Sequence, residues 1–387
     1  MVQHGEKTGV VKMGGAVYLA HPVPQEVNQV WAEWKVSAGD GVLVLLAEGS
    51  QEAVAGLQQA ARDAGMELAG GVFPELVVQG AFVKTGAVLV RLPKPFRFLL
   101  TDGMAGPLAE WEPKAEEVAG GLETLVRGLP NPTLFFMVDA QVVSTASLLD
   151  RIYLRVGRQA RYVGVSVGSE SFTPMNCLFD RERLLGSGLL ALALPGLPSA
   201  RLSHGYRPPK VVIHATSTCQ NRVNTINWEP AFAVYARLAK EQYGVDIHKE
   251  NFYQMSVHFP FGLMLMDGTV LVRIPVQLTD EGHLYCVGEI PENALLTLLQ
   301  APEQNLMESV ETLAGGMNQD GWKRALTFYC AGRRMHLGAS QATAELNALG
   351  GGGREMVGAL TLGEIGHERE GGYPHFHNGA VVCAPWI

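Results

Sequence analysis

Ser166 is the first residue whose surroundings could carry chemistry, because residues 164–168 read Gly-Val-Ser-Val-Gly. Serine hydrolases hold their nucleophile in such a pattern, at a sharp turn where a strand runs straight into a helix. Residues 169–174 contain two serines and end in proline, which is typical of a loop and not of a helix start. We therefore interpret the match as chance, and a hydrolase built around Ser166 stays as an alternative of another class.

Histidine and cysteine offer two further chemistries near the C-terminus. His375 and His377 are two residues apart, so on a strand both side chains would lie on one face, as metal ligands could. They adjoin a Gly-Gly-Tyr-Pro turn, and we interpret them as histidines of a surface loop. Cys330 ends an apolar run just before Arg333 and Arg334. It is either a small buried residue at a strand end or a thiol made reactive by the arginines.

The familiar catalytic and metal motifs are absent from the sequence. It contains no Walker A loop, no Gly-x-Gly-x-x-Gly run and no His-Glu-x-x-His pair. The five cysteines are odd in number and widely spread, and none forms a Cys-x-x-Cys pair. This excludes covalent c-type haem, and a zinc ribbon and a disulfide framework both fit poorly. We therefore expect no enzyme.

Composition limits the partners and the location. A chain of 387 residues that is 47% hydrophobic and 18% charged predicts about two or three globular domains. The net charge of −8 leaves no basic stripe for phosphates, so we expect neither a nucleic acid nor a membrane as partner. No apolar run approaches the ~20 residues that span a bilayer, and we see no secretion signal. A cytoplasmic protein with reduced thiols is the expectation.

Hydrophobic periodicity predicts strands that alternate with helices. Strands are predicted at 42–47, 66–71, 76–78, 81–91, 97–100, 133–138, 162–167, 189–194, 210–216, 270–275, 283–288, 324–329, 357–362 and 379–383. Helices are predicted at 51–64, 114–129, 141–156, 231–243, 305–317 and 341–349. The residues before 42 are expected to be frayed. The alternation predicts an α/β fold with α+β elements, in which mixed sheets are flanked by helices, with a boundary near 221–228.

Motifs along nearly the whole chain resemble one known family. Residues 325–334 (ALTFYCAGRR), 357–366 (VGALTLGEIG) and the pair His377-Asn378 resemble the C-terminal half of the FIST sensory domain. Residues 203–206 (SHGY) and 224–235 (NTINWEPAFAVY) resemble its middle, and 70–74 (GGVFP) its N-terminal half. The resemblance covers about residues 38–383. It implies a two-part FIST architecture, with an N-terminal FIST domain at 1–225 and a C-terminal FIST domain at 226–387.

The FIST family senses small ligands in bacterial signalling. One free-standing branch binds haem, responds to nitric oxide and regulates a partner sensor histidine kinase in trans. This chain resembles that branch at residues 175–179, 259–262, 286–293 and 358–364. It departs from the pattern at Tyr206, where tryptophan is usual, and at 163–167, where a more glycine-rich run is usual.

The resemblance implies haem b, which needs an axial histidine in an apolar pocket. His204 is the first candidate for the iron ligand, because it lies in the SHGY turn beside Tyr206. His258 is the second, with Phe259 and Phe261 as surfaces against which a porphyrin could pack. Each histidine also has an ordinary interpretation as a hydrogen-bonded structural residue, and each phenylalanine as part of the core.

Arg333, Glu364 and Cys330 are candidates for a ligand pocket without haem. A charged residue after an apolar strand often faces a pocket, so Arg333 and Glu364 could bind a carboxylate or each other. A FIST sensor for an amino acid or similar metabolite is therefore the first alternative to the haem sensor. The sequence leaves the oligomeric state open, a homodimer included.

Overall fold

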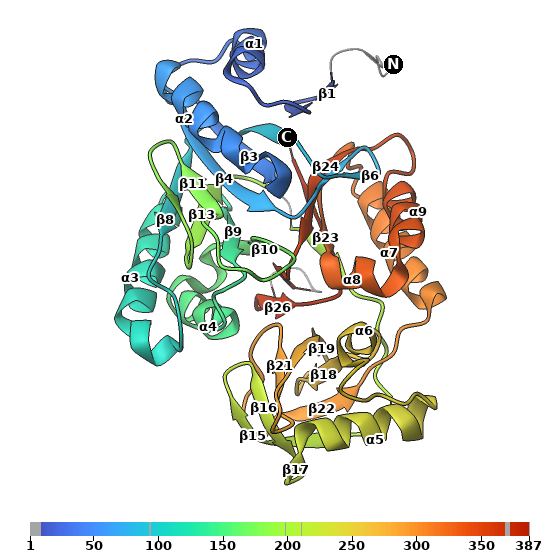
Figure 1. The fold of residues 1–387 in the computed structure, drawn as a ribbon. Coiled ribbons are helices and arrows are strands. Elements are labelled where there is room, and N and C mark those ends of the chain that lie inside the picture. Colours follow the sequence, from blue (N-terminus) through green and yellow to red (C-terminus); the bar gives the residue numbers. More distant parts are fainter. Residues whose placement is uncertain (1–8, 93, 198, 210, 368–371, 387) are drawn as a thin grey trace.

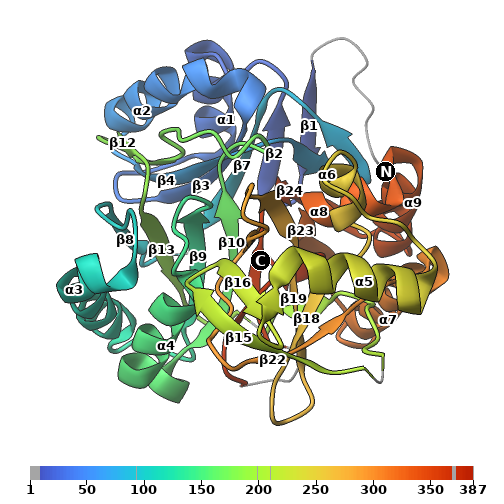
Figure 2. The ribbon, with the colours of Figure 1, turned by 60° about the horizontal axis from the view of Figure 1, so that its bottom comes forward.

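The computed structural model describes residues 9–92, 94–197, 199–209, 211–367 and 372–386. The predicted class is confirmed, because mixed sheets are flanked by helices in a two-part architecture. One part, which we call the core, holds residues 10–203 and 303–385. The other, which we call the insert, holds residues 213–298. Figure 1 shows the insert, coloured from yellow-green to orange, beneath the core, and in Figure 2 it comes forward in front of the core.

Within the described residues, the core contains three copies of one unit. Unit 1 comprises β2 (Ala16–Leu19), α1 (Pro24–Trp34), β3 (Gly41–Ala47), α2 (Val54–Asp63), β4 (Glu67–Phe73), β5 (Leu76–Val78), β6 (Ala81–Val83) and β7 (Ala87–Leu92). Unit 2 comprises β8 (Arg97–Thr101), α3 (Leu108–Val126), β9 (Thr133–Asp139), α4 (Thr145–Val156), β10 (Arg161–Val167), β11 (Leu178–Asp180), β12 (Leu184–Leu185) and β13 (Leu189–Leu194). Unit 3 comprises β14 (Arg201–Ser203), α7 (Glu303–Gln319), β23 (Arg324–Cys330), α8 (Ala331–Leu337), α9 (Ala339–Leu349), β24 (Glu355–Thr361), β25 (Glu364–Gly366), β26 (His375–His377) and β27 (Val381–Pro385).

The three units share their hydrogen-bond register. The parallel pairs β3–β4, β9–β10 and β23–β24 each enclose a crossover helix, and each carries an antiparallel last strand of its own unit. At the ends of the parallel pairs, Ala47 lies opposite Phe73, Asp139 opposite Val167, and Cys330 opposite Thr361. Ala47, Asp139 and Cys330 are therefore equivalent positions, and each N–H donates to the residue that precedes the last strand of its unit.

The units are joined by an exchange of strands. β5 of unit 1 pairs with β24 of unit 3, β11 of unit 2 with β4 of unit 1, and β25 of unit 3 with β10 of unit 2. All three pairings are antiparallel. The helix pairs α1–α2, α3–α4 and α7–α9 lie around the outside, blue at the top, teal to green at the left and orange at the right of Figure 1.

One glycine recurs at the same register position in the three units. Gly70, Gly164 and Gly358 each lie three residues before the end of β4, β10 and β24. A Cβ atom on Gly358 would come within 1.7 Å of the Thr327 carbonyl oxygen. On Gly164 it would come within 2.8 Å of the Phe136 carbonyl oxygen. Neighbouring backbone therefore occupies the space of a side chain at both places.

The insert follows β14 and returns to the core at α7. It comprises β15 (Ile213–Cys219), β16 (Arg222–Ile226), β17 (Glu229–Pro230), α5 (Ala231–Tyr243), α6 (Phe252–Ser256), β18 (Phe261–Met264), β19 (Val270–Arg273), β20 (Pro275–Leu278), β21 (Leu284–Cys286) and β22 (Leu295–Leu298). The sheet has β19 at one end and β20 at the other, and only Ile274 separates these strands in the chain. The sheet therefore curls around its own apolar core, which α5 and α6 complete. The predicted division at 225/226 falls inside β16, before its last residue, and it stays a prediction.

Several elements differ from the expectation. The supposedly frayed opening forms β1 (Val10–Met13), β2 and α1, because β2 pairs with β7 and β1 pairs with β2 at the edge of the first sheet. The long strand predicted at 81–91 is broken into β6 and β7. Helix α3 begins six residues before the predicted start, with Pro113 in its second turn. His375 and His377 lie in β26, and His377 is fully buried, so the surface-loop interpretation of this pair was wrong for His377. In the described ranges no helix is long and apolar enough to cross a membrane.

Candidate functional site

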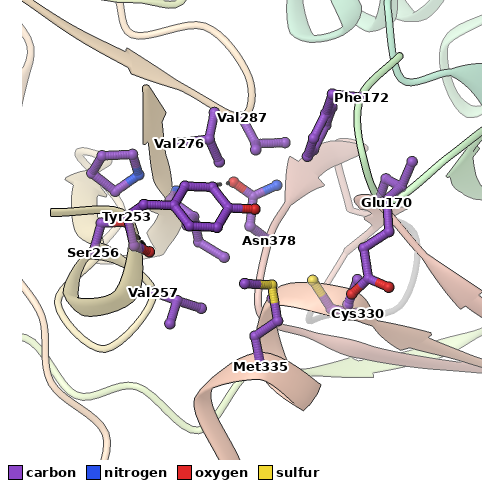
Figure 3. A pocket seen from close by; sticks show the side chains of 15 residues that line it. Glu170, Phe172, Tyr253, Ser256, Val257, Val276, Val287, Cys330, Met335 and Asn378 are labelled. Atoms are coloured by element: carbon purple, nitrogen blue, oxygen red, sulfur yellow. Dashed lines mark hydrogen bonds between the residues drawn. The ribbon is translucent and has the colours of Figure 1, made fainter. Parts of the chain in front are cut away.

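A pocket with a cavity volume of about 50 Å³, partly open to solvent, lies between the core and the insert. We call it the interface pocket (Figure 3). The core contributes Glu170, Phe172, Cys330, Ala331, Gly332, Met335, Leu362 and Asn378. The insert contributes Tyr253, Ser256, Val257, Ile274, Pro275, Val276 and Val287. Most of these side chains are apolar, and an apolar lining with a few polar groups is typical of small-molecule sites.

Cys330 places its sulfur at the wall of this pocket, on the same side as the sulfur of Met335 (Figure 3). It ends β23 directly before α8, and the Gly379 N–H donates a hydrogen bond to its Sγ at 3.1 Å. The backbone N–H groups of Gly332 and Arg333 also favour the thiolate. Burial outweighs these donors and raises the pKa of the thiol, so Cys330 is protonated at neutral pH.

Glu364 lies beside the Cys330 thiol, close enough for each group to shift the pKa of the other. Its side chain is fully buried at the start of β25, and burial raises its pKa to about 8. The Thr361 hydroxyl donates to Oε1 at 2.6 Å. Among the described residues Oε2 has no hydrogen-bond partner. Glu364 is therefore mainly a neutral acid at pH 7, with one oxygen available.

A network of ion pairs lies on the core side of the pocket. Arg334 bonds Glu170 at 3.0 Å and Glu75 at 2.8 Å, and its guanidinium lies over the Phe82 ring. Glu75 follows β4 and Glu170 follows β10, so this network links units 1 and 2 to α8 of unit 3. Glu170 is thus the charged residue of the pocket wall, and its charge is already paired.

Arg333 does not line the pocket, and its ion-pair partner is not Glu364. It is fully buried and bonds Glu345 of α9 through Nε and Nη2, both at 2.8 Å. The remaining donors reach the carbonyl oxygens of His204, Gly379 and Leu306 and the Ser309 hydroxyl. All five guanidinium N–H groups are engaged with the protein. Arg333 therefore holds α7, α8, α9 and the SHGY turn together and is not available to bind a carboxylate ligand.

The first haem candidate lies away from the interface pocket. His204 is buried, and its Nδ1 accepts a hydrogen bond from the Tyr206 N–H at 3.0 Å. The surface hollow that reaches it is lined largely by polar side chains and turn backbone: Ser203, Gly205, Arg207, Asn305, Glu308, Ser309 and Thr312. Tyr206 packs its ring against Gly379. A porphyrin needs an apolar slot over one face of the imidazole. His204 and Tyr206 do not fit that requirement.

The second haem candidate joins the insert to the core. His258 Nδ1 lies 2.8 Å from Nδ1 of His336 on α8, and His336 Nε2 lies 2.9 Å from the Ala301 oxygen. Burial lowers the pKa of both rings, so both are neutral at pH 7. Phe259 and Phe261 point away from His258 into the hydrophobic interior of the insert, where they pack against Tyr243 and Tyr235. The predicted haem residues thus lie in three separate places, and they do not fit the group.

Two further contacts fasten the insert to the core. The Glu289 carboxylate accepts from the Ser147 N–H at 2.9 Å and from its hydroxyl, at the start of α4. Arg273 is buried without an ion pair among the described residues and donates to the Phe376 oxygen at 2.9 Å. Together with the pair His258–His336, these contacts join the insert to the core at the interface that holds the pocket.

Ser166 lies inside β10, not at a strand-to-helix turn. Its backbone N–H donates to the Gly363 carbonyl oxygen at 2.7 Å, and its carbonyl oxygen accepts from the Leu362 N–H, as in an ordinary strand residue. The elbow that a serine hydrolase requires is not formed. In the described ranges no three histidine, cysteine or acidic side chains are grouped to hold a metal ion.

The sequence pointed to Cys330 and Glu364 but missed the rest of the pocket. Phe172, Tyr253, Met335 and Asn378 come from four distant segments, and no local pattern joins them. Asn378 gave the best signal, because it follows His377 in a motif that carried the family resemblance. Its Oδ1 accepts from the Ile274 N–H at 3.2 Å, and its Nδ2 donates to the His377 oxygen at 3.0 Å. It therefore ties the core to the bend of the insert sheet.

Replacing Glu364 with glutamine should change how stability depends on pH. The pKa of Glu364 is raised from 4.5 in the unfolded chain to about 8, so its contribution to stability is complete below 4.5 and is lost as pH rises to about 8. The free energy of unfolding of the wild type, relative to Glu364→Gln, should therefore fall across this window, by at most about 1.4 kcal/mol per pH unit, and stay flat above it. Urea unfolding between pH 5 and 9 measures it.

The exposed Glu292→Gln serves as the matched control and should follow the wild type at every pH. Parallel profiles for the wild type and Glu364→Gln would show that Glu364 is ionised throughout.

Comparison with known families matches part of this chain. The FIST C domain matches residues 231–367, from the start of α5 to just beyond β25. This is 137 of the 387 residues, and it supports a FIST-domain protein. The match includes α6, Cys330, Met335 and Glu364. No curated protein matches the chain at a significant level.

Proposed function

From the match of residues 231–367 to the FIST C domain, we propose that this chain is a small-molecule sensor whose ligand binds in the interface pocket. FIST domains form a sensory family, and the interface pocket has the apolar lining with a few polar groups that small-ligand sites share. We place the protein in the cytoplasm, with a sensor histidine kinase as the partner that reads its state.

One observation carries this proposal: both the core and the insert line the pocket. A ligand that contacts both parts favours the arrangement in which they are closed on it. The contacts Glu289–Ser147, Arg273–Phe376 and His258–His336 lie at the same interface, so a change of arrangement alters them too. A coupling of about 1–3 kcal/mol is typical of such links and changes a partner's affinity several-fold.

The chemistry of the pocket favours a neutral, mainly apolar ligand that carries a hydrogen-bond acceptor. The thiol of Cys330 is protonated, the amide of Asn378 carries no charge, and Glu170 is paired with Arg334. A zwitterionic amino acid would lose its hydration on entering the pocket without gaining a counter-charge, because Arg333 already forms an ion pair with Glu345. We therefore favour an uncharged metabolite over an amino acid.

Haem-based sensing of nitric oxide is the second proposal, and it rests on the family resemblance. His377 favours it, since this buried imidazole near His204 has neither ring nitrogen hydrogen-bonded among the described residues. The cofactor would supply iron that binds nitric oxide. His204 and His258 do not fit as ligands of its iron.

Octan-3-one, a neutral apolar molecule with one carbonyl acceptor, tests the pocket. At a hundred times its Kd it should add about 2.7 kcal/mol of stability, which raises Tm by about 3 °C for a chain of this length. Met335→Arg places a cation in the pocket wall and should abolish the shift. Met266→Arg, at a fully exposed turn of the insert, is the matched control and should keep it. Thermal unfolding of the full chain measures all three.

Two outcomes would count against the pocket as the ligand site. One is the absence of any shift in the wild type, and the other is an equal shift in Met335→Arg. The visible spectrum of protein purified from haem-supplemented cells tests the second proposal separately. A stoichiometric Soret band that moves with nitric oxide would make haem the ligand.

A further inference from the structure

The interface pocket brings a nucleophile and a proton acceptor together. The Cys330 sulfur lines the pocket, and Thr361, opposite Cys330 in the sheet, bonds the Glu364 carboxyl. This fully buried carboxyl lies beside the thiol with Oε2 unpartnered among the described residues. The Gly379 N–H at 3.1 Å supports negative charge on the sulfur. Thiols react as thiolates, and an adjacent base is one way in which proteins form them.

Another donor in the same pocket is placed to receive a carbonyl oxygen. Asn378 donates one Nδ2 hydrogen to the carbonyl oxygen of His377, so its second Nδ2 hydrogen can be donated to a ligand. In Figure 3 its amide lies opposite Cys330 and Met335 across the pocket. A ligand with an electrophilic carbon near the sulfur and a carbonyl oxygen near Asn378 would contact both.

We propose that Cys330 captures an apolar α,β-unsaturated carbonyl compound covalently in the interface pocket, with Glu364 accepting the thiol proton. The proposal deepens the sensor function above and rests on it. It names the ligand class and makes the sensor's response a chemical one.

The reaction needs no reactant beyond the protein and the ligand. The thiol proton passes to the Glu364 carboxylate while the sulfur electron pair forms a bond to the β-carbon. The π electrons of the C=C bond move to give an enolate, whose oxygen accepts the Asn378 hydrogen bond. Glu364 then returns the proton to the α-carbon. The net change is addition of S–H across C=C, and nothing is oxidised or reduced.

Burial explains why the site would be selective. It raises the pKa of Cys330, so the thiol alone is unreactive, and only a ligand seated in the apolar pocket meets sulfur and base together. The groups that face Glu364 are the Thr361 hydroxyl, the Ala380 N–H, the Cys330 thiol and the more distant Arg333. The ionised fraction of Glu364 carries the reaction, so the rate should rise with pH up to about 8.

The experiment uses the full chain with Cys219→Ser, which removes the exposed thiol; the other three cysteines are buried. Oct-1-en-3-one is the probe, and octan-3-one is its saturated match, which cannot undergo this addition. Intact mass should show one adduct, and peptide mapping should place it at Cys330. Cys330→Ser should give none, yet octan-3-one should still raise its Tm. Glu364→Gln should slow labelling at pH 7 at least tenfold.

Each of the other outcomes contradicts one part of the proposal: the pocket, the covalent capture or the role of Glu364. If octan-3-one raises Tm but Cys330 is not labelled, covalent capture fails while the sensor pocket stands. If neither compound acts, both proposals fail. Equal labelling rates in Glu364→Gln and the wild type would remove Glu364 as the base. Should that variant not fold, the wild-type rate decides: a rise that levels off near pH 8 supports the base, and a flat profile overturns it.

Discussion

Replacing Arg333 with methionine should destabilise the protein by about 3–5 kcal/mol, because the change leaves a buried carboxylate without its partner. Glu345 is only 1% exposed and also accepts from the Tyr329 hydroxyl. The carbonyl oxygens of Leu306 and Gly379 lose a donor in the same step. Urea unfolding at pH 7 measures the loss of stability.

Arg237→Met is the matched control, because it breaks an exposed bidentate pair with Glu229 on the insert. Exposed pairs contribute about 0–1 kcal/mol, so this variant should stay close to the wild type. The double variant Arg333→Met with Glu345→Gln removes the orphaned charge and should recover part of the loss. Equal effects of Arg333→Met and Arg237→Met would contradict the structural assignment.

Replacing Gly358 with alanine should cost more than 4 kcal/mol or prevent folding. The new Cβ would lie 1.7 Å from the Thr327 carbonyl oxygen, and this backbone atom belongs to the neighbouring strand of the same sheet. A strand cannot shift that far without breaking its ladder, so the cost falls in the exceptional range for single substitutions. Expression level and the urea midpoint measure it.

Gly120→Ala is the matched control, since a Cβ at Gly120 in α3 meets nothing within 4 Å. Alanine is the better helix former by roughly 0.5–1 kcal/mol, so this variant should gain stability. Gly164→Ala should rank with Gly358→Ala, because its Cβ would meet backbone at the equivalent position of unit 2. A mild effect of both strand variants would mean that the three units do not share one close-packed register.

Local pattern predicted most of the individual elements. The helix at 231–243 and the strands that became β3, β9 and β23 were found because apolar runs of strand length and helical spacing are local signals. The threefold repetition was not predicted. It lies in register and topology, and beyond the glycines at 70, 164 and 358 the units share little at the sequence level. Nor could the sequence show that the parallel pairs of three units meet through exchanged strands.

The candidate site also holds some residues that the sequence predicted and others that it did not. Cys330 and Glu364 were named from short motifs, and the structure brings them together. Arg333 was named beside them, but its neighbour in space is Glu345, twelve residues along the chain on α9. The haem residues drew on the family resemblance, which does not fix what each ring faces in this chain. Contacts such as Asn378 with Ile274 depend on how the insert packs, and no local pattern carries that information.

The exchange of strands also bears on how the protein is made. On the ribosome, unit 1 emerges first, yet its β5 must wait for β24 near the other end of the chain. Units 1 and 2 each receive their borrowed strand, β11 and β25, from the unit made next, whereas unit 3 receives β5 from unit 1. Non-local strand pairing of this kind is slow to form and leaves apolar edges exposed meanwhile. The core is therefore completed only when its last unit has been released, and until then the nascent chain presents the unpaired edges that chaperones bind.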